Sequence, residues 1–199
     1  MKQLSIPKSQ NTEEIAQLIR EKRESLKKSL KKAHRKDFSI RAVAKRVGIS
    51  PTHLERLEHG ERDLSTINII YGISRELNIP LNQLVKVYLG LSDEEERRCF
   101  LVDGGAYHDI DNSRIIKDKS AKLLEKRGYK VTEQEVATKL GCSKSHFNHY
   151  KSGRRKFKDI RLLYGLSELF DVPLYVFIRN ELGITDDEIA RVINLDIRE

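Results

Sequence analysis

The chain has little of several residue types, and each shortage excludes a class of protein. Its 199 residues include only two cysteines, Cys99 and Cys142, and no tryptophan. Two cysteines can form neither a disulfide framework nor the usual four-ligand structural zinc site. No apolar run approaches the roughly 18 residues of a membrane span, and the N-terminus has no apolar stretch of signal-peptide length. We therefore expect a reduced, cytoplasmic protein, and neither a secreted scaffold nor a membrane protein.

Groups of residues that carry catalysis are also missing from the sequence. It has no nucleophile–base constellation, no glycine-rich phosphate loop and no cluster with metal-ligand spacing. We therefore expect no enzymatic activity, no cofactor and no metal site.

The charged residues that are present are unevenly distributed. Lysine and arginine number 38 and aspartate and glutamate 30, which gives a formal net charge of +8. Residues 114–161 hold 15 basic and 5 acidic residues, whereas residues 162–199 hold 3 and 8. Residues 15–63 hold 14 and 7. A local excess of positive charge indicates a phosphate-rich partner more strongly than net charge alone.

The second half of the chain repeats the first at an offset of 93 residues. Of the 53 positions from 43 to 95, 17 are identical to the residue 93 positions later. The glycines at 48, 60 and 90 and the proline at 80 stay in register with those at 141, 153, 183 and 173. Self-similarity of this kind predicts two copies of one domain. We expect a first domain at 1–98, a partly ordered connector at 99–113 and a second domain at 114–199.

Helical spacing of apolar residues dominates both copies, and no window shows the alternation of a strand. Asn11 with Glu14 is expected to cap a long first helix whose apolar face includes Ile15 and Ile19. The other helix starts expected in the first copy lie at Ser39, Ser50, Ser65 and Pro80, and the expected stops are Gly48, Gly60 and Gly90. Capping boxes at 92–95 and 185–188 predict one more helix in each copy. The predicted fold is all-α, with two five-helix domains in tandem, each followed by a short extra helix.

Two stretches, 39–58 and 132–151, have the pattern of a helix, a tight turn and a second helix. Ala44 and Ala137 lie midway along the first helix, where a small side chain lets the second helix cross closely. Gly48 and Gly141 follow four residues later, and glycine permits the positive φ of a tight turn. The second helix then has an outward face that fits a major groove about 12 Å wide.

This arrangement resembles the helix-turn-helix of the Cro and lambda-repressor family, also called the XRE family. The matching residues are Val43 and Ala44, Gly48 to Ser50, Leu54, Leu57 to Gly60, Arg62, Ile67 and Leu77 to Pro80. The resemblance covers about 15–90 and 113–183. It implies a five-helix DNA-binding domain, usually in a dimeric transcription regulator, such as a repressor, at a palindromic operator.

Three places depart from the family pattern. The family often has Gln near the start of the first helix of the motif, where this chain has Ile40 and Glu133. The Glu before the family's glycine is kept as Glu58 and replaced by Lys151. Glu55 stands at an expected groove-facing place, where it repels phosphate but could accept from a cytosine amino group.

The second copy is expected to make the stronger contact with DNA. Its expected groove-facing residues are Lys144, Ser145, Asn148 and His149, and Asn148 suits adenine. Its expected phosphate contacts are Lys151, Arg154, Arg155 and Lys156. In the first copy the expected contacts are Thr52, Arg56 and Arg62.

These features predict a sequence-specific regulator that binds double-stranded DNA in the cytoplasm, associated with the nucleoid, as a homodimer or an intramolecular pseudo-dimer. The alternative is a protein-interaction or antitoxin-like module in which only the second copy binds DNA and the first copy binds a protein partner. Glu55 and Glu58 in the first copy favour this alternative. For the lysine-rich run at 27–36, a solvated helix face is the simpler interpretation.

Overall fold

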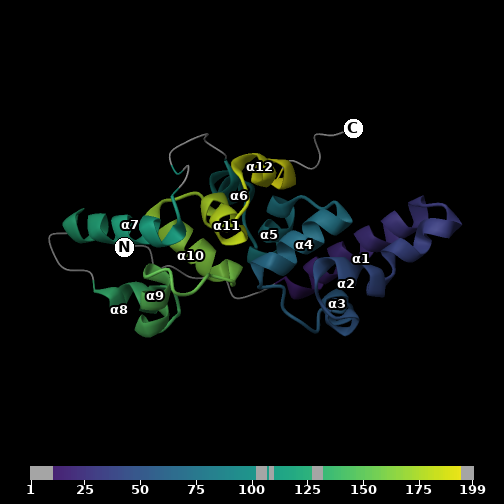
Figure 1. Cartoon of the computed structure of the whole chain (residues 1–199), viewed down its shortest axis with the longest axis horizontal. Helices are drawn as coiled ribbons and strands as arrows, with labels where there is room; N and C mark the ends of the chain where they lie inside the picture. Colours follow the sequence, from purple (N-terminus) through teal and green to yellow (C-terminus); the bar gives the residue numbers. More distant parts are fainter. Residues whose placement is uncertain (1–10, 102–106, 108–109, 127–131, 194–199) are drawn as a thin grey trace. The chain divides into compact units, whose positions relative to one another are not determined.

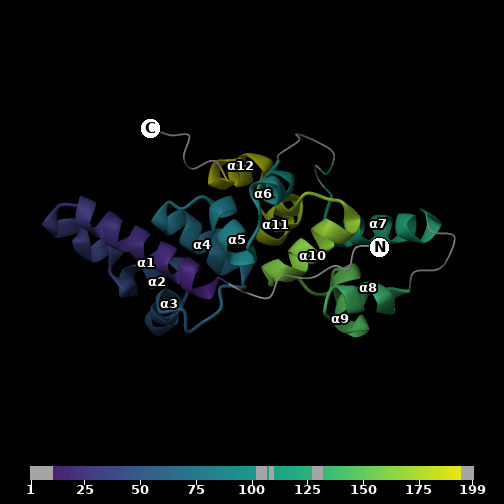
Figure 2. The ribbon, with the colours of Figure 1, turned by 180° about the vertical axis from the view of Figure 1, so that it is seen from behind.

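The computed structural model describes residues 11–101, 107, 110–126 and 132–193. Every element of regular structure within these residues is helical, with twelve α-helices and one 3-10 helix (Figures 1 and 2). The predicted all-α class is therefore confirmed. None of the described helices combines the length and the apolar character needed to cross a membrane. Residues 102–106 and 108–109 of the expected connector lie outside the described residues.

Backbone contacts divide the chain into two units. Of the described residues, one unit, here called the N-terminal unit, takes in 11–96 and 190–193. The other, the C-terminal unit, takes in 97–101, 107, 110–126 and 132–189. The division falls within two helices, α6 (Asp93–Phe100) and α12 (Asp186–Ile193).

The N-terminal unit begins with the long helix α1 (Thr12–Ser29), which buries Ile15, Ala16 and Ile19 on one face. The expected capping pair before it is wrong. The Asn11 side chain makes no cap hydrogen bond, and its Nδ2 instead donates to the Val87 carbonyl at 3.1 Å. That bond ties the start of α1 to α5 (Leu81–Leu89).

The next elements are the 3-10 helix η1 (Lys32–Phe38), which the sequence patterns did not predict, and the pair α2 (Ile40–Val47) and α3 (Pro51–Glu58). The Ser39 hydroxyl accepts from the Ala42 N–H, and the Ser50 hydroxyl accepts from the His53 N–H. Gly48 ends α2 in the left-handed conformation at φ +81°. These signals were all predicted, and they fix a short turn between two helices, of which α3 packs against α1 (Figures 1 and 2).

Three further helices follow: α4 (Ile67–Leu77), α5 and α6. The N-cap of α4 is Thr66, one residue after the expected Ser65, and it makes no side-chain cap hydrogen bond. The capping box before α6 is confirmed, because Ser92 and Glu95 exchange hydrogen bonds in both directions.

The C-terminal unit contains α7 (Asn112–Lys126), α8 (Glu133–Lys139), α9 (Lys144–Lys151), α10 (Ile160–Phe170) and α11 (Leu174–Leu182), followed by the start of α12. Thr132 and Glu135 form a complete capping box for α8, and Ser143 caps α9. Thr185 and Glu188 form the predicted box before α12. The four helices α9 to α12 each begin 93 residues after α3 to α6.

Individual contacts recur at the same offset within the separate units. Ser74 Oγ donates to the Ile79 carbonyl and Ser167 Oγ to the Val172 carbonyl, both at 2.7 Å. In the same way Lys86 pairs with Asp93, and Arg179 pairs with Asp186. The two stretches of sequence therefore build the same local interactions.

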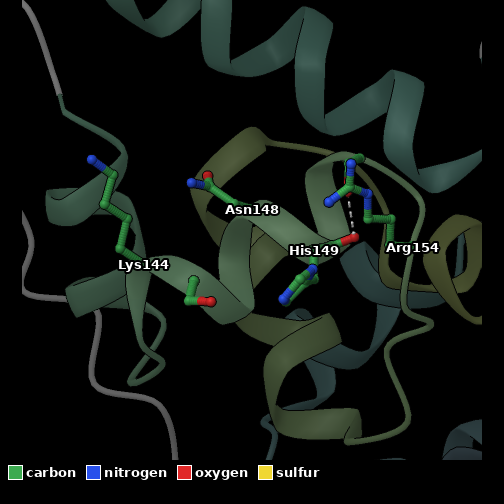
Figure 3. A pocket seen from close by; sticks show the side chains of 6 residues that line it. Lys144, Asn148, His149 and Arg154 are labelled. Atoms are coloured by element: carbon green, nitrogen blue, oxygen red, sulfur yellow. Dashed lines mark hydrogen bonds between the residues drawn. The ribbon is translucent and has the colours of Figure 1, made fainter.

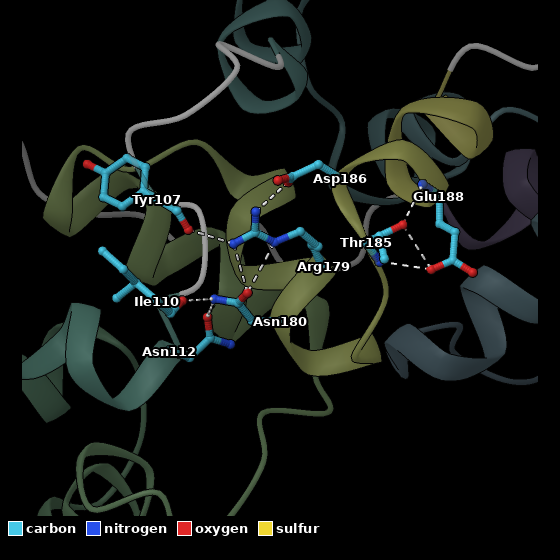
Figure 4. Close-up of polar contacts among 8 residues, drawn as sticks. All are labelled: Tyr107, Ile110, Asn112, Arg179, Asn180, Thr185, Asp186 and Glu188. Carbon is cyan, nitrogen blue, oxygen red and sulfur yellow. Dashed lines mark hydrogen bonds and ion pairs between the residues drawn. The ribbon is translucent and has the colours of Figure 1, made fainter.

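A buried polar network in the C-terminal unit holds the segment before α7 against α11 (Figure 4). Arg179 Nη2 donates to the Tyr107 carbonyl, and Asn180 Nδ2 donates to the Ile110 carbonyl, both at 2.8 Å. Asn112 Nδ2 donates to the Phe177 carbonyl at 3.2 Å. Backbone carbonyls of an irregular segment are satisfied in this way by side chains of a regular helix.

Candidate nucleic-acid interface

In the N-terminal unit, α3 turns one face inward and another to solvent. Leu54 and Leu57 are buried. Thr52 and Arg56 are exposed, as is Arg62 in the loop that follows the helix. These three are the residues predicted to contact DNA in this unit, and all of them are accessible to a partner. Glu55 is exposed on the same helix.

Glu58 faces the interior and forms an ion pair with Arg23 of α1. Two hydrogen bonds join the guanidinium to the carboxylate, at 2.6 and 2.7 Å, and the side chains are 6% and 2% exposed. The hydrogen bonds to Glu58 raise the pKa of Arg23 despite its burial. Glu58 is thus not on the outward face, and the expectation that it weighs against DNA contact is wrong.

In the C-terminal unit, α9 is anchored by aromatic residues. Phe147 is fully buried, and the Tyr150 ring stacks on Phe157 with centroids 3.8 Å apart. Because one side of α9 is fixed by these rings, the side chains on its other side are held toward solvent in a defined orientation.

The outward side of α9 carries an open hollow of about 490 Å³ (Figure 3). Its lining residues are Lys144, Ser145, Asn148, His149, Ser152 and Arg154. Five of these six were predicted DNA contacts, and Ser152 was not. The backbone N–H of Arg154 donates to the His149 carbonyl at 2.9 Å, which fixes the loop against the end of the helix.

The predicted groove residues differ in accessibility. Lys144 and Ser145 are exposed, whereas Asn148 and His149 are half-buried. Asn148 Oδ1 is buried and has no hydrogen-bond partner among the described residues. A contact between Asn148 and adenine would therefore require its amide group to rotate.

The predicted phosphate contacts surround this hollow. Arg154, Arg155 and Lys156 are exposed, and Lys156 Nζ makes a long contact of 3.4 Å with the Glu181 carbonyl. Lys151 is half-buried, because its Nζ donates to Glu133 Oε1 at 2.9 Å. Glu133 was noticed in the sequence as a departure from the family pattern, but its partner was not predicted. The signal was a pair of opposite charges at the first position of α8 and the last position of α9.

A histidine faces an arginine in both units at the same place. His146 Nε2 lies 3.1 Å from Arg155 Nη1. Their counterparts 93 residues earlier are His53 and Arg62, and burial first, then the charge of Arg62, lowers the pKa of His53. Both arginines belong to the predicted DNA contacts, and each interacts with a histidine on the second helix of its motif.

No group of three or more potential metal ligands comes together within the ranges that the structure describes. The outward surface of α9 and its loop carries cationic, hydroxyl and imidazole groups. These groups bind phosphates and base edges by hydrogen bonds and charge.

Comparison with protein families gives a match at the first motif. Residues 30–84 match the family model HTH_3, described as helix-turn-helix. This range runs from the end of α1 through α4 and into α5, and α8 and α9 lie outside it. No curated protein and no solved structure matches the chain. Residues 30–84 are therefore similar to the helix-turn-helix of the HTH_3 type, and this match supports an XRE-like DNA-binding regulator.

Proposed function

We propose that this chain is a sequence-specific, double-stranded DNA-binding transcription regulator that uses two helix-turn-helix domains, one in each unit. The second would be formed by α8 and α9. The 93-residue offset of the helices and the recurrence of the caps and buried contacts support a second domain of the same kind. The two domains would correspond to the expected ranges 1–98 and 114–199, joined by 99–113.

The observation that carries the proposal is the outward surface of α9. Lys144, Ser145 and His149 share one hollow with Arg154, and Arg155 and Lys156 follow in the adjoining loop. A helix that presents hydroxyl, imidazole and ammonium groups beside a cationic loop suits base edges in the groove and phosphates at its rim. Asn148 would join the base contacts after rotation of its amide, and Lys151 would contact a phosphate when it is released from Glu133.

The N-terminal unit contributes a second, less basic contact. Thr52 and Arg56 would face the groove, and Arg62 would contact a phosphate. The two domains of one chain would bind two half-sites as a pseudo-dimer, or two chains would bind as a homodimer. Either arrangement places half-sites about 34 Å apart if both helices lie on one face of the duplex. The chain would act in the cytoplasm on nucleoid DNA, without cofactor or metal and without enzymatic activity.

Selection from random duplex DNA tests this function. The full-length chain should enrich a defined sequence, and substitution of Ser145 and His149 by alanine should lower affinity for that sequence by about 10-fold or more, because each good base contact contributes roughly 1–3 kcal/mol. Binding without enrichment of any sequence would refute sequence specificity, and no binding to any duplex would refute the function itself.

A second candidate function is favoured by the acidic residues on and after α3. Glu55, Glu61 and Asp63 are exposed around Arg56 and Arg62, and such carboxylates disfavour close approach of phosphates. The N-terminal unit would then bind a basic protein surface, as in an antitoxin-like module, while the C-terminal unit binds DNA. A footprint on the selected duplex separates the two, because this alternative predicts protection of one half-site only.

A further inference from the structure

Glu133 lies where the candidate DNA-contacting residues of α9 meet the start of α8. Its Oε1 accepts a hydrogen bond from Lys151 Nζ at 2.9 Å, and the two side chains are 38% and 29% exposed. The ion pair joins the first residue of α8 to the last residue of α9.

Two other residues of α9, Asn148 and Lys144, also interact with the Glu133 carboxylate. The hydrogen bond from Lys151 is the largest cause of the lowered pKa of Glu133, and a hydrogen bond from Asn148 and the charge of Lys144 lower it further. Three of the candidate contact residues on α9 therefore interact with one negative charge.

The cap of α8 does not need this carboxylate. Thr132 and Glu135 complete the capping box by themselves, with Thr132 N–H donating to Glu135 at 2.6 Å. The N-terminal unit has Ile40 at the corresponding place, and its Glu58 is occupied by Arg23 in the interior. A carboxylate that neutralises the second helix of the motif is thus found at this place only in the C-terminal unit.

We propose that Glu133 is a specificity-determining residue, which pairs with Lys151 and so withdraws this cation from indiscriminate contact with DNA phosphates. This inference rests on the proposed function. Non-specific binding depends almost entirely on cations that replace counterions on phosphates. A lysine already paired with a carboxylate gains little from a phosphate, and the carboxylate repels the phosphate.

The effect differs between specific and non-specific complexes. On a random sequence the protein can shift along the duplex until any free cation meets a phosphate. On the selected sequence, base contacts hold α9 in one register, in which the pair between Lys151 and Glu133 can persist. Glu133 therefore weakens binding to random DNA more than binding to the selected sequence.

The test uses the full-length chain with a random-sequence 30-bp duplex and with the sequence enriched by selection. Glu133→Gln keeps the shape of the side chain and removes its charge. We expect this variant to bind the random duplex about two- to fivefold more tightly, the range of exposed ion pairs. The slope of log K against log salt should steepen by about 0.9, the value of one added phosphate contact. The ratio of the two affinities should fall.

Glu135→Gln is the matched control, because it removes the same charge two residues away and glutamine preserves the capping box. It should leave the ratio unchanged. In a Lys151→Met background, Glu133→Gln should lose most of its effect, which separates the ion pair from a general change in charge. Circular dichroism confirms that each variant is folded.

The outcomes distinguish this inference from the function on which it rests. If the wild type binds DNA and Glu133→Gln behaves like Glu135→Gln, the inference alone is overturned. If the wild type binds no duplex, the proposed function is overturned and the inference with it.

Discussion

Arg23 and Glu58 illustrate how the tertiary surroundings of a residue decide whether its charge serves binding or stability. Glu58 is next to exposed positions in the sequence, yet its carboxylate is buried and doubly hydrogen-bonded to Arg23. At the position of the C-terminal unit that corresponds to Glu58 stands Lys151, which pairs with Glu133 instead. The buried carboxylate of the first unit is thus replaced in the second by a cation in a surface pair.

Glu58→Gln should destabilise the N-terminal unit by about 1–3 kcal/mol, because it removes the buried counterion of Arg23 and leaves only Glu24, whose side chain is 37% exposed. Chemical denaturation followed by circular dichroism measures this loss. Glu55→Gln, three residues earlier on the exposed side, should change stability by less than about 0.5 kcal/mol. The double variant Arg23→Ile with Glu58→Leu should recover most of the loss. Equal stability of Glu58→Gln and Glu55→Gln would contradict the buried pair.

His53 should make the stability of the N-terminal unit depend on pH. Burial, and then the charge of Arg62, lowers its pKa below the ordinary value of 6.5. The unfolded chain therefore takes up a proton at a higher pH than the folded chain. The contribution of His53 to stability is complete above pH 6.5 and is lost as the pH falls through the lower folded-state pKa.

Denaturation at a series of pH values between 7.5 and 5 checks this expectation. The His53→Gln variant should lose less stability over that interval than the wild type. Arg62→Gln should remove the smaller part of the effect, because burial is the larger cause. An identical pH dependence of His53→Gln and wild type would show that His53 does not titrate differently on folding.

At the scale of elements, the turn between α2 and α3 sets the orientation of the exposed helix. Ser39 and Ser50 cap the two helices, and Gly48 takes a positive φ between them. A side chain added at Gly48 would meet no atom within 4 Å, so the requirement for glycine there comes from the backbone conformation alone.

Gly48→Ala should therefore cost about 1–2 kcal/mol, the strain of a Cβ atom in the left-handed region. Gly48→Asn should cost less, since asparagine tolerates that region, as Asn78 does at the end of α4 with φ +51°. Thermal unfolding of the two variants measures the difference. A loss for asparagine as large as for alanine would indicate that something other than φ selects glycine.

At the scale of the whole molecule, positive charge occurs both around α9 and on the segment 27–36. The second group lies on α1 and η1 and comprises Lys27, Lys28, Lys31, Lys32, Arg35 and Lys36, of which all but Lys27 are exposed. The proposed function assigns DNA phosphates to the group around α9 and solvent to the other. The two groups can be compared at equal charge.

Neutralising Lys144, Lys151, Arg154, Arg155, Lys156 and Lys158 together, by substitution with glutamine, should abolish tight binding to the selected duplex. The slope of log K against log salt should become shallower by about 0.9 for each phosphate that the protein no longer neutralises. The same change at the six cations of 27–36 should have a much smaller effect on both quantities. Similar losses for both sets would mean that binding follows net charge and not the surface of α9.

Local signals predicted much of the fold, and the candidate site only in part. Serine caps, left-handed glycines and capping boxes act within four residues of the chain, and those at Ser50, Gly48 and Ser92 were found where expected. The expected cap at Asn11 was wrong. Its side chain makes no cap hydrogen bond, and its Nδ2 donates to the carbonyl of Val87, which is 76 residues away in the sequence. The position of η1 likewise carried no clear local signal.

The sequence by itself determined most of the helices, the 93-residue repeat and five of the six residues that line the hollow on α9, because periodicity and capping are properties of neighbouring residues. Only the tertiary structure decided that Glu58 is internal, that Asn148 has a buried carbonyl oxygen and that Lys151 is held by Glu133. Each of these depends on which charge or surface comes within a few ångströms from another helix, and that distance is set by packing.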